Sequence, residues 1–196
     1  MRAPTLLAGK AEGIPHRYSG DAPEQVAKNI VALMASAGAC LLGNDPGWPG
    51  VILHGPLGRG KTSAACEVLR FFDANGKSGL FTVLYDMVGE IKSVWGSDIA
   101  EKAAASRFIR PALLVVDEVG VQFDTEAERN ILYSIIVARH NKGFPTILTT
   151  NDDLDADDGR AAFYDSVGFR VASRFEGALI NSGAWGGNLR TPKIGF

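Results

Sequence analysis

Cysteine is nearly absent from this chain: only Cys40 and Cys66 occur among 196 residues. Their spacing does not match a metal site, and two buried thiols are typical of a reducing cytosol rather than of a disulfide-stapled secreted domain. The net charge is small as well, −2 at pH 7. That value provides no bulk attraction to nucleic acid, so any contact with DNA must come from a local patch.

Long apolar runs are also missing. The longest stretch without a charged residue, 29–44, is too short to span a membrane and is interrupted by Ser36 and Gly38. The first residues do not form the apolar core of a signal peptide, and no repeat or low-complexity tract is visible. The apolar fraction of 46% is that of a globular protein. We therefore expect a soluble, cytoplasmic protein that does not associate with membranes.

One glycine-rich stretch organises the rest of the chain. Residues 55–62, Gly-Pro-Leu-Gly-Arg-Gly-Lys-Thr, fit the pattern G-x-x-x-x-G-K-[ST]. The apolar run 51–54 before it predicts a buried strand, and 63–75 after it has apolar residues at helical spacing. A strand, a glycine-rich turn and a helix start, in that order, present main-chain N–H groups to phosphate oxygens. The sequence therefore predicts binding of a nucleoside triphosphate.

The side chains of this loop have separate expected tasks. Lys61 would reach the β- and γ-phosphates, and Thr62 would supply its hydroxyl to Mg²⁺. The residues expected to surround the nucleotide are Gly55, Pro56, Gly58, Arg59, Gly60, Lys61, Thr62 and Ser63.

A second chemical signal follows an apolar run. Residues 112–116 predict a central parallel strand, and Asp117-Glu118 follows at once. Asp117 would hold Mg²⁺, and Glu118 would polarise the water that attacks the γ-phosphate. Taken alone, such a pair is also typical of a solvent-facing acidic turn. Downstream of a phosphate-binding loop it favours hydrolysis.

Another strand, over 145–150, ends at Asn151. That side chain would orient the attacking water, or would only form a turn, as Asn commonly does at strand ends.

The remaining patterns concern secondary structure. Thr125 and Glu128 match a capping box that begins a helix. The acidic stretch 152–160 is typical of a solvated loop, and a helix is expected over 163–176.

These patterns predict an α/β fold, a parallel five-stranded sheet flanked by helices. Residues 1–20 are interpreted as an N-terminal arm and 21–196 as the ATPase domain. The expected strands lie at 51–54, 80–85, 112–116, 145–150 and 178–182.

Several stretches resemble the ATPase domain of DnaC-type replicative helicase loaders and of the related IstB-type transposition ATPases. They are Gly-Ile-Pro-His-Arg-Tyr at 13–18, the acidic strand end with its Gly-Val-Gln continuation at 120–122, Thr149-Thr150-Asn151, and Gly-Phe-Arg-x-x-x-Arg-Phe at 168–175. Phe169 departs from the glutamate that is usual in the last of these. The resemblance implies an AAA+ P-loop ATPase core.

The resemblance also implies roles for residues outside the loop. Arg170 would act as a catalytic arginine finger in the nucleotide site of a neighbouring subunit, so that the protein self-associates through it, and Arg174 would support nucleotide binding. From the residues alone, two arginines one helical turn apart are usually an ordinary solvated helix face.

Segment 86–95 is similar to the family region whose aromatic residue contacts single-stranded DNA. This implies that Trp95 stacks on a base while Lys92 meets phosphate. A tryptophan at this spacing is as commonly a core residue.

The sequence therefore predicts an ATP- and Mg²⁺-dependent ATPase that acts as a helicase loader on single-stranded DNA with a hexameric replicative helicase. Two alternatives remain open: an IstB-like transposition helper that acts on duplex DNA, and a nucleotide-gated adaptor with little turnover. A small-molecule kinase is disfavoured because no arginine-rich lid for a second substrate is visible.

Overall fold

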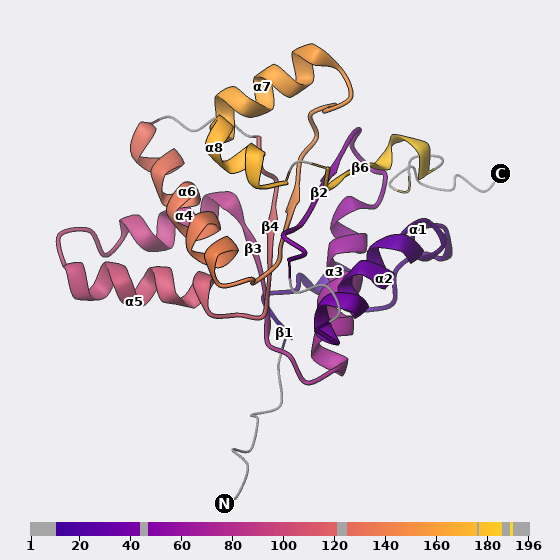
Figure 1. Ribbon diagram of the computed structural model, residues 1–196, viewed down its shortest axis with the longest axis horizontal. Coiled ribbons are helices and arrows are strands. Elements are labelled where there is room, and N and C mark those ends of the chain that lie inside the picture. Colours follow the sequence, from indigo (N-terminus) through magenta and orange to yellow (C-terminus); the bar gives the residue numbers. More distant parts are fainter. Residues whose placement is uncertain (1–10, 44–46, 121–124, 176, 186–188, 190–196) are drawn as a thin grey trace, which may run out of the picture.

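The computed structural model describes residues 11–43, 47–120, 125–175, 177–185 and 189. In this part of the chain six strands form one parallel sheet, in the order β1-β3-β4-β5-β2-β6 (Figure 1). The α/β fold with a parallel sheet is confirmed, and five of the strands are the expected ones. The sixth, β1, comes from the segment interpreted as an arm. The bounds are β1 (Ala11–Glu12), β2 (Gly50–His54), β3 (Gly79–Val83), β4 (Leu113–Asp117), β5 (Thr146–Thr149) and β6 (Leu179–Asn181).

Helices cover both faces of the sheet because successive strand side chains point to opposite sides. Val51 and Leu53 pack with one layer, and Ile52 between them packs with the other. The first layer holds α1 (Glu24–Asn29), α2 (Val31–Leu41) and α3 (Lys61–Ala74) (Figure 1). The second holds α4 (Leu84–Lys92), α5 (Asp98–Ile109), α6 (Glu126–Asn141), α7 (Asp157–Val167) and α8 (Phe169–Ala172). Burial on both faces explains why the strands are continuous apolar runs.

The strand order determines which loops meet. Parallel strands have their carboxyl ends at one edge of the sheet, and β5 lies between β4 and β2. The residues that follow these three strands therefore come together: the glycine-rich loop after His54, Glu118 after Asp117, and Thr150 after Thr149. A ligand site at this edge is the usual arrangement in open parallel sheets.

Some boundaries differ from the expected ones. The strand expected over 80–85 ends at Val83, which pairs with Asp117 at the end of β4, and α4 begins at Leu84. The helix expected over 163–176 is interrupted at Gly168, whose φ is 85°, so α8 and the 3₁₀ turn η2 (Ser173–Phe175) follow α7. Part of the stretch expected to be an acidic loop begins α7, because carboxylates in a first turn favour the helix dipole.

The capping box that begins α6 is confirmed. The Thr125 hydroxyl accepts the Glu128 N–H at 3.3 Å, and the Glu128 carboxylate accepts the Thr125 N–H at 3.1 Å.

The two cysteines were expected to be buried thiols. Cys66 is buried, and this burial raises the pKa of its thiol to about 12, whereas Cys40 is only partly buried.

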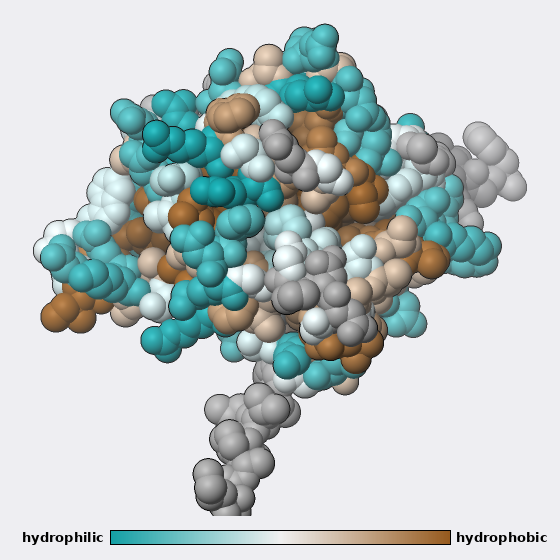
Figure 2. Space-filling view, in the orientation of Figure 1, coloured by the Kyte–Doolittle hydropathy of each residue, from teal (hydrophilic) through white to brown (hydrophobic). Residues whose placement is uncertain are grey.

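On the face drawn in Figure 2, hydrophobic residues lie in several separate groups among hydrophilic ones. Among the large hydrophobic residues of the described chain, Tyr85 and Ile99 are the most exposed, each at 84%. No helix in this part of the chain is long and apolar enough to cross a bilayer.

Candidate functional site

The loop between β2 and α3 has the conformation that its glycines permit. Gly55, Gly58 and Gly60 have φ values of 110°, 77° and 90°, a region that strains other residues. At Gly60 a Cβ atom would lie 2.5 Å from Cγ2 of Val26, so α1 packs directly on the turn. Helix α3 begins at Lys61, and its first main-chain N–H groups and positive dipole end therefore face the loop.

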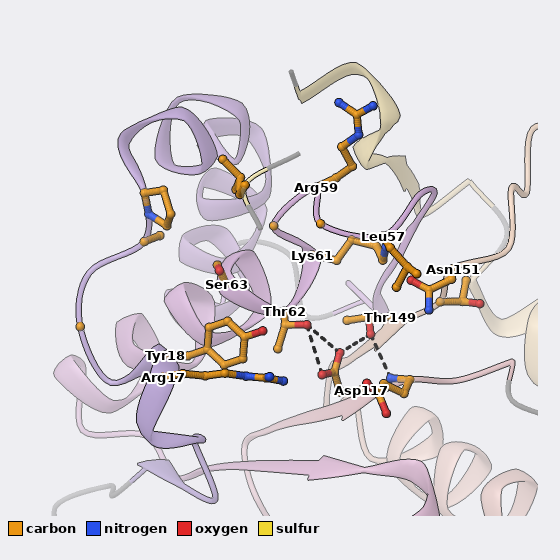
Figure 3. A pocket seen from close by; sticks show the side chains of 18 of the residues that line it. Arg17, Tyr18, Leu57, Arg59, Lys61, Thr62, Ser63, Asp117, Thr149 and Asn151 are labelled. Atoms are coloured by element: carbon orange, nitrogen blue, oxygen red, sulfur yellow. Dashed lines mark hydrogen bonds between the residues drawn. The ribbon is translucent and has the colours of Figure 1, made fainter. Parts of the chain in front are cut away.

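Lys61 and Thr62 open α3 and have different partners. The Lys61 ammonium is buried and donates hydrogen bonds to the carbonyl oxygens of Gly55 at 2.6 Å and Pro56 at 2.9 Å. The Thr62 hydroxyl lies 3.2 Å from each carboxylate oxygen of Asp117 (Figure 3). The glycine-rich loop and the acidic strand end, far apart in the sequence, therefore meet in one place.

Thr149 fixes the acidic strand end from the neighbouring strand. Its hydroxyl donates to Oδ1 of Asp117 and accepts the main-chain N–H of Glu118 at 3.1 Å, and its carbonyl accepts the N–H of Val119 at 2.7 Å. Among non-glycine residues of the described chain, Glu118 alone has positive φ, 59°. Such a conformation costs about 1–3 kcal/mol and persists only where neighbouring contacts impose it. The Glu118 side chain is exposed, whereas that of Asp117 is buried.

These groups line one cavity of about 300 Å³ at the carboxyl edge of the sheet. Of the residues predicted from the sequence, nine line it, whereas Gly55 and Pro56 contribute through their hydrogen bonds to Lys61. Arg59 lines the rim, and its side chain points away from Thr62 and Asp117 (Figure 3). The nine are Gly58, Arg59, Gly60, Lys61, Thr62, Ser63, Asp117, Glu118 and Asn151.

Other lining residues had no assigned role at the level of the sequence. A wall comes from the segment before α1, with Arg17, Tyr18 and Pro23 among its residues, and Arg70 of α3 and Thr149 also contribute. The family resemblance of the stretch 13–18 is a sequence signal that points to this wall. Arg70 carries no such signal.

A comparison with protein-family models matches residues 48–167 to the family described as IstB-like ATP binding protein. The match covers more than half of the chain and includes the loop, the acidic strand end and Asn151. The chain belongs to this family. The solved structures that are similar to this chain share its fold.

Proteins that are similar to this chain differ in their described roles. The replicative helicase loader DnaC of Escherichia coli is 29% identical over 105 residues, which are 53% of this chain and 43% of that protein. An ATP-binding protein of an insertion sequence in Mycobacterium tuberculosis is 32% identical over 106 residues, 52% of this chain and 40% of that protein. The matched part thus spans less than half the length of these relatives.

Among solved structures, a crystal structure of the DnaC helicase loader superposes with a TM-score of 0.64 at 23% identity, and the match covers 85% of this chain and 98% of that one. This likeness concerns the fold.

Arg170 and Arg174 do not line the cavity of their own chain. Arg170 is exposed on α8, with its guanidinium 5.8 Å from the centre of the Tyr133 ring. Arg174 is partly buried, and its Nε has no hydrogen-bond partner within the described residues. The Val121-Gln122 part of the family resemblance lies outside the described residues, and the roles of both arginines remain predictions.

Lys92 and Trp95 lie beyond this cavity, at and after the end of α4. Trp95 is 48% exposed, so it is not the buried core residue that was the alternative. Lys92 donates a hydrogen bond to Glu128 at 2.9 Å, which lowers the pKa of that carboxylate, and its ammonium is 5.7 Å from the Trp95 ring centre. In this structure the charge of Lys92 is thus engaged within the chain.

His54 and Asp152 connect the loop to the segment after β5. His54 is buried directly before Gly55, and its Nδ1 accepts the N–H of Leu154 at 3.2 Å. Burial lowers the pKa of His54, while the carboxylates of Asp155 and Asp153 oppose that shift. The Asp152 carbonyl accepts the N–H of Gly55 at 3.1 Å. The neutral imidazole therefore helps to hold the loop against the residues that follow Asn151.

The donor atoms at the cavity fit a magnesium ion and a polyphosphate. A hydroxyl and a carboxylate converge at Thr62 and Asp117, and Mg²⁺ prefers such hard oxygen ligands while retaining several waters. The loop supplies main-chain N–H groups and one lysine, the groups that recognise phosphate at a helix start.

Proposed function

We propose that this chain binds ATP with Mg²⁺ and hydrolyses it. The observation that carries the proposal is the contact of the Thr62 hydroxyl with both oxygens of Asp117, at 3.2 Å, beside the start of α3. This contact joins a phosphate-binding loop to an acidic strand end within one cavity. The family description as ATP-binding supports the same assignment.

Each side chain would then have one task. Lys61, now hydrogen-bonded to two loop carbonyls, would exchange these for β- and γ-phosphate oxygens. Thr62 and Asp117 would hold Mg²⁺, which when bound would neutralise charge on the phosphate oxygens. Glu118 would accept a proton from the attacking water, and Asn151, exposed at the cavity, would orient that water. The local strain at Glu118 supports this role, because strained residues gather at active sites.

Arg170 would complete the site of a neighbouring copy. It is exposed and does not line its own cavity, and stacking on Tyr133 restricts its direction. An arginine supplied across a subunit interface stabilises charge in the transition state of phosphoryl transfer. Arg174 would support the nucleotide site through contacts that arise on assembly. ATP binding would thus be coupled to self-association.

The cellular role that we propose is loading of a hexameric replicative helicase on single-stranded DNA. Its support is the likeness to DnaC helicase loaders. Trp95 offers a half-exposed ring on which any base can stack, and Lys92 would release Glu128 to meet phosphate.

A transposition helper is the second candidate, favoured by the family match and by the insertion-sequence relative. The two roles differ in the DNA that is bound. Titration of the ATP-bound protein with matched single-stranded and duplex oligonucleotides would separate them: preference for single strands supports helicase loading, and preference for duplex supports transposition.

Phosphate release tests the proposed hydrolysis. Wild type should turn over ATP with Mg²⁺, and Glu118→Gln should lose about 10²- to 10⁴-fold in rate, the usual contribution of a general base. Glu126→Gln is the matched control, because Glu126 is exposed in the first turn of α6 and does not line the cavity. Equal rates in wild type and Glu118→Gln would refute the catalytic role. ATP binding without turnover, even with DNA, would select the adaptor.

Complementation tests the arginine finger. Neither Arg170→Ala nor Lys61→Ala should be active alone, whereas their mixture should regain part of the activity, since one copy retains the arginine and the other a competent nucleotide site. A mixture as inactive as its components would exclude action across an interface.

A further inference from the structure

The short segment before α1 forms one wall of the cavity. Its 3₁₀ turn η1 (His16–Tyr18) brings Arg17 and Tyr18 to the same space as Thr62 and Asp117. None of the roles proposed above for the P-loop and the acidic strand end involves this wall. Both residues belong to the stretch 13–18, which resembles the helicase-loader family.

Helix α3 holds this wall with a row of polar side chains three positions apart. The carboxylate of Glu67 accepts the N–H of Ala22 at 3.2 Å, and Nη1 of Arg70 donates to the carbonyl of Tyr18 at 2.7 Å. Glu67 and Arg70 also pair with each other. Residues at this spacing share one helix face. The helix that begins with Lys61 therefore also fixes the wall across the cavity.

The segment fits closely on the sheet as well. Gly13 has φ of 78°, and a Cβ atom there would lie 2.2 Å from the carbonyl oxygen of Phe81. The N–H of Ala11 donates to Asp73 at 3.0 Å. The turn that carries Arg17 is thus anchored on the sheet side as well as on α3.

Arg17 extends from this wall along the cavity toward Thr62 and Asp117 (Figure 3). Its guanidinium is 4.8 Å from the centre of the Tyr18 ring, a contact that limits its rotamers. Among the described residues no carboxylate forms an ion pair with it. An arginine is always charged, and its planar fork matches phosphate oxygens. Arg17 is exposed. Although Asp21, Asp117 and Glu118 also line the cavity, the guanidinium forms no ion pair with a described residue and can therefore accept an anionic ligand.

We propose that Arg17 binds phosphate oxygens of the nucleotide held on the loop, from a different wall than Lys61. This inference rests on the proposed nucleotide binding and adds a second cation from the same chain. Since the guanidinium belongs to the N-terminal segment, occupancy of the cavity also tightens residues 11–23 against α3. Arg17 contacts the phosphates of the ligand and not its base.

Equilibrium titration tests the assignment, with Arg17→Ala compared with His16→Ala. His16 is the exposed neighbour on the same turn and does not line the cavity. Arg17→Ala should weaken ATP binding in the presence of Mg²⁺ about tenfold, which corresponds to about 1.4 kcal/mol, and His16→Ala should bind as wild type does. Inorganic tripolyphosphate, used as a competitor, should lose affinity by the same factor.

Hydrogen exchange supplies a readout of the segment itself. ATP should slow amide exchange within 11–23 in wild type, and this protection should be lost in Arg17→Ala at saturating ATP. Wild-type affinity in Arg17→Ala would overturn the inference while the proposed function stands. Weaker ATP binding with unchanged tripolyphosphate affinity would also overturn it, since Arg17 would then read the sugar or base. Failure of wild type to bind ATP would overturn both proposals.

Discussion

Replacing Thr149 by valine tests how the acidic strand end is held. The two side chains have nearly the same shape, and Thr149 is 2% exposed, so the substitution removes a hydroxyl without opening a cavity. That hydroxyl donates to Asp117 and accepts the N–H of Glu118. Thr149→Val therefore deprives a buried carboxylate and a main-chain N–H of their partner at once.

The expected magnitude follows from these two contacts. A hydrogen bond to a charged group contributes about 1.5–3 kcal/mol, and a donor left unsatisfied in the interior costs about 1–3 kcal/mol. The added methyl group and partial relaxation at Glu118 offset part of this loss. We expect the free energy of unfolding to fall by about 2–4 kcal/mol, which lowers the Tm of a domain of this size by roughly 4–16 °C.

The substitution should also change the Mg²⁺ dependence of ATP hydrolysis. The orientation of Asp117 depends on Thr149, and loss of such a supporting contact commonly weakens metal binding about 10- to 100-fold. The Mg²⁺ concentration at half-maximal ATP hydrolysis should rise by that factor in Thr149→Val and stay near the wild-type value in Thr149→Ser.

Denaturant unfolding and Mg²⁺ titration of hydrolysis measure the two effects. Thr82→Val is the matched control, because the Thr82 hydroxyl bonds only the neighbouring carbonyl of Val83, at 3.1 Å; its unfolding free energy should change by less than about 1 kcal/mol. If Thr149→Val were as stable as Thr82→Val and kept its Mg²⁺ dependence, the account of the strand end would be wrong.

Three further predictions concern buried groups. Arg139 is fully buried, burial lowers its pKa to about 9, and its guanidinium donates to four main-chain carbonyls and a hydroxyl. Arg139→Met should therefore lower the free energy of unfolding by about 3–5 kcal/mol in denaturant titrations. Arg107→Met is the control at a half-exposed ion pair and should lower it by less than about 1 kcal/mol. Burial lowers the pKa of His54 below its usual 6.5, so the unfolded chain takes up a proton at a higher pH than the folded chain does. The free energy of unfolding should therefore fall as the pH drops through 6.5. If His54→Gln showed the same dependence of this free energy on pH, the effect would not come from His54. The raised pKa of Cys66, about 12, predicts that iodoacetamide at pH 8 labels Cys66 only after unfolding, as mass spectrometry of the digested protein would show.

The site could be predicted from the sequence where it depends on local order. A strand, three glycines and a helix start specify the loop at 55–62 within a few residues, and the acidic pair follows directly from an apolar run. That Thr62 meets Asp117 then follows from parallel topology, since all strands end at one edge. The capping box of α6 is likewise a contact across three positions.

The wall at Arg17 and Tyr18 could not be predicted in this way. Its position depends on Arg70, 52 positions away, and on the packing of Gly13 against β3. Such contacts leave no periodic pattern in the sequence. The end of β3 could not be predicted either. The last residue of β3, Val83, pairs with Asp117, where β4 ends, so the length of β3 is set by the neighbouring strand and not by residues 84 and 85.

Calorimetric titration of the wild-type chain with ATP in excess Mg²⁺ tests the central claim most directly, with Lys61→Ala measured alongside. The account predicts saturable binding at one site per chain, weakened at least about tenfold in the variant, because a charge-assisted contact to phosphate is lost. Absence of binding in wild type, or equal affinity in Lys61→Ala, would contradict the claim that the loop and the acidic strand end form a nucleotide site.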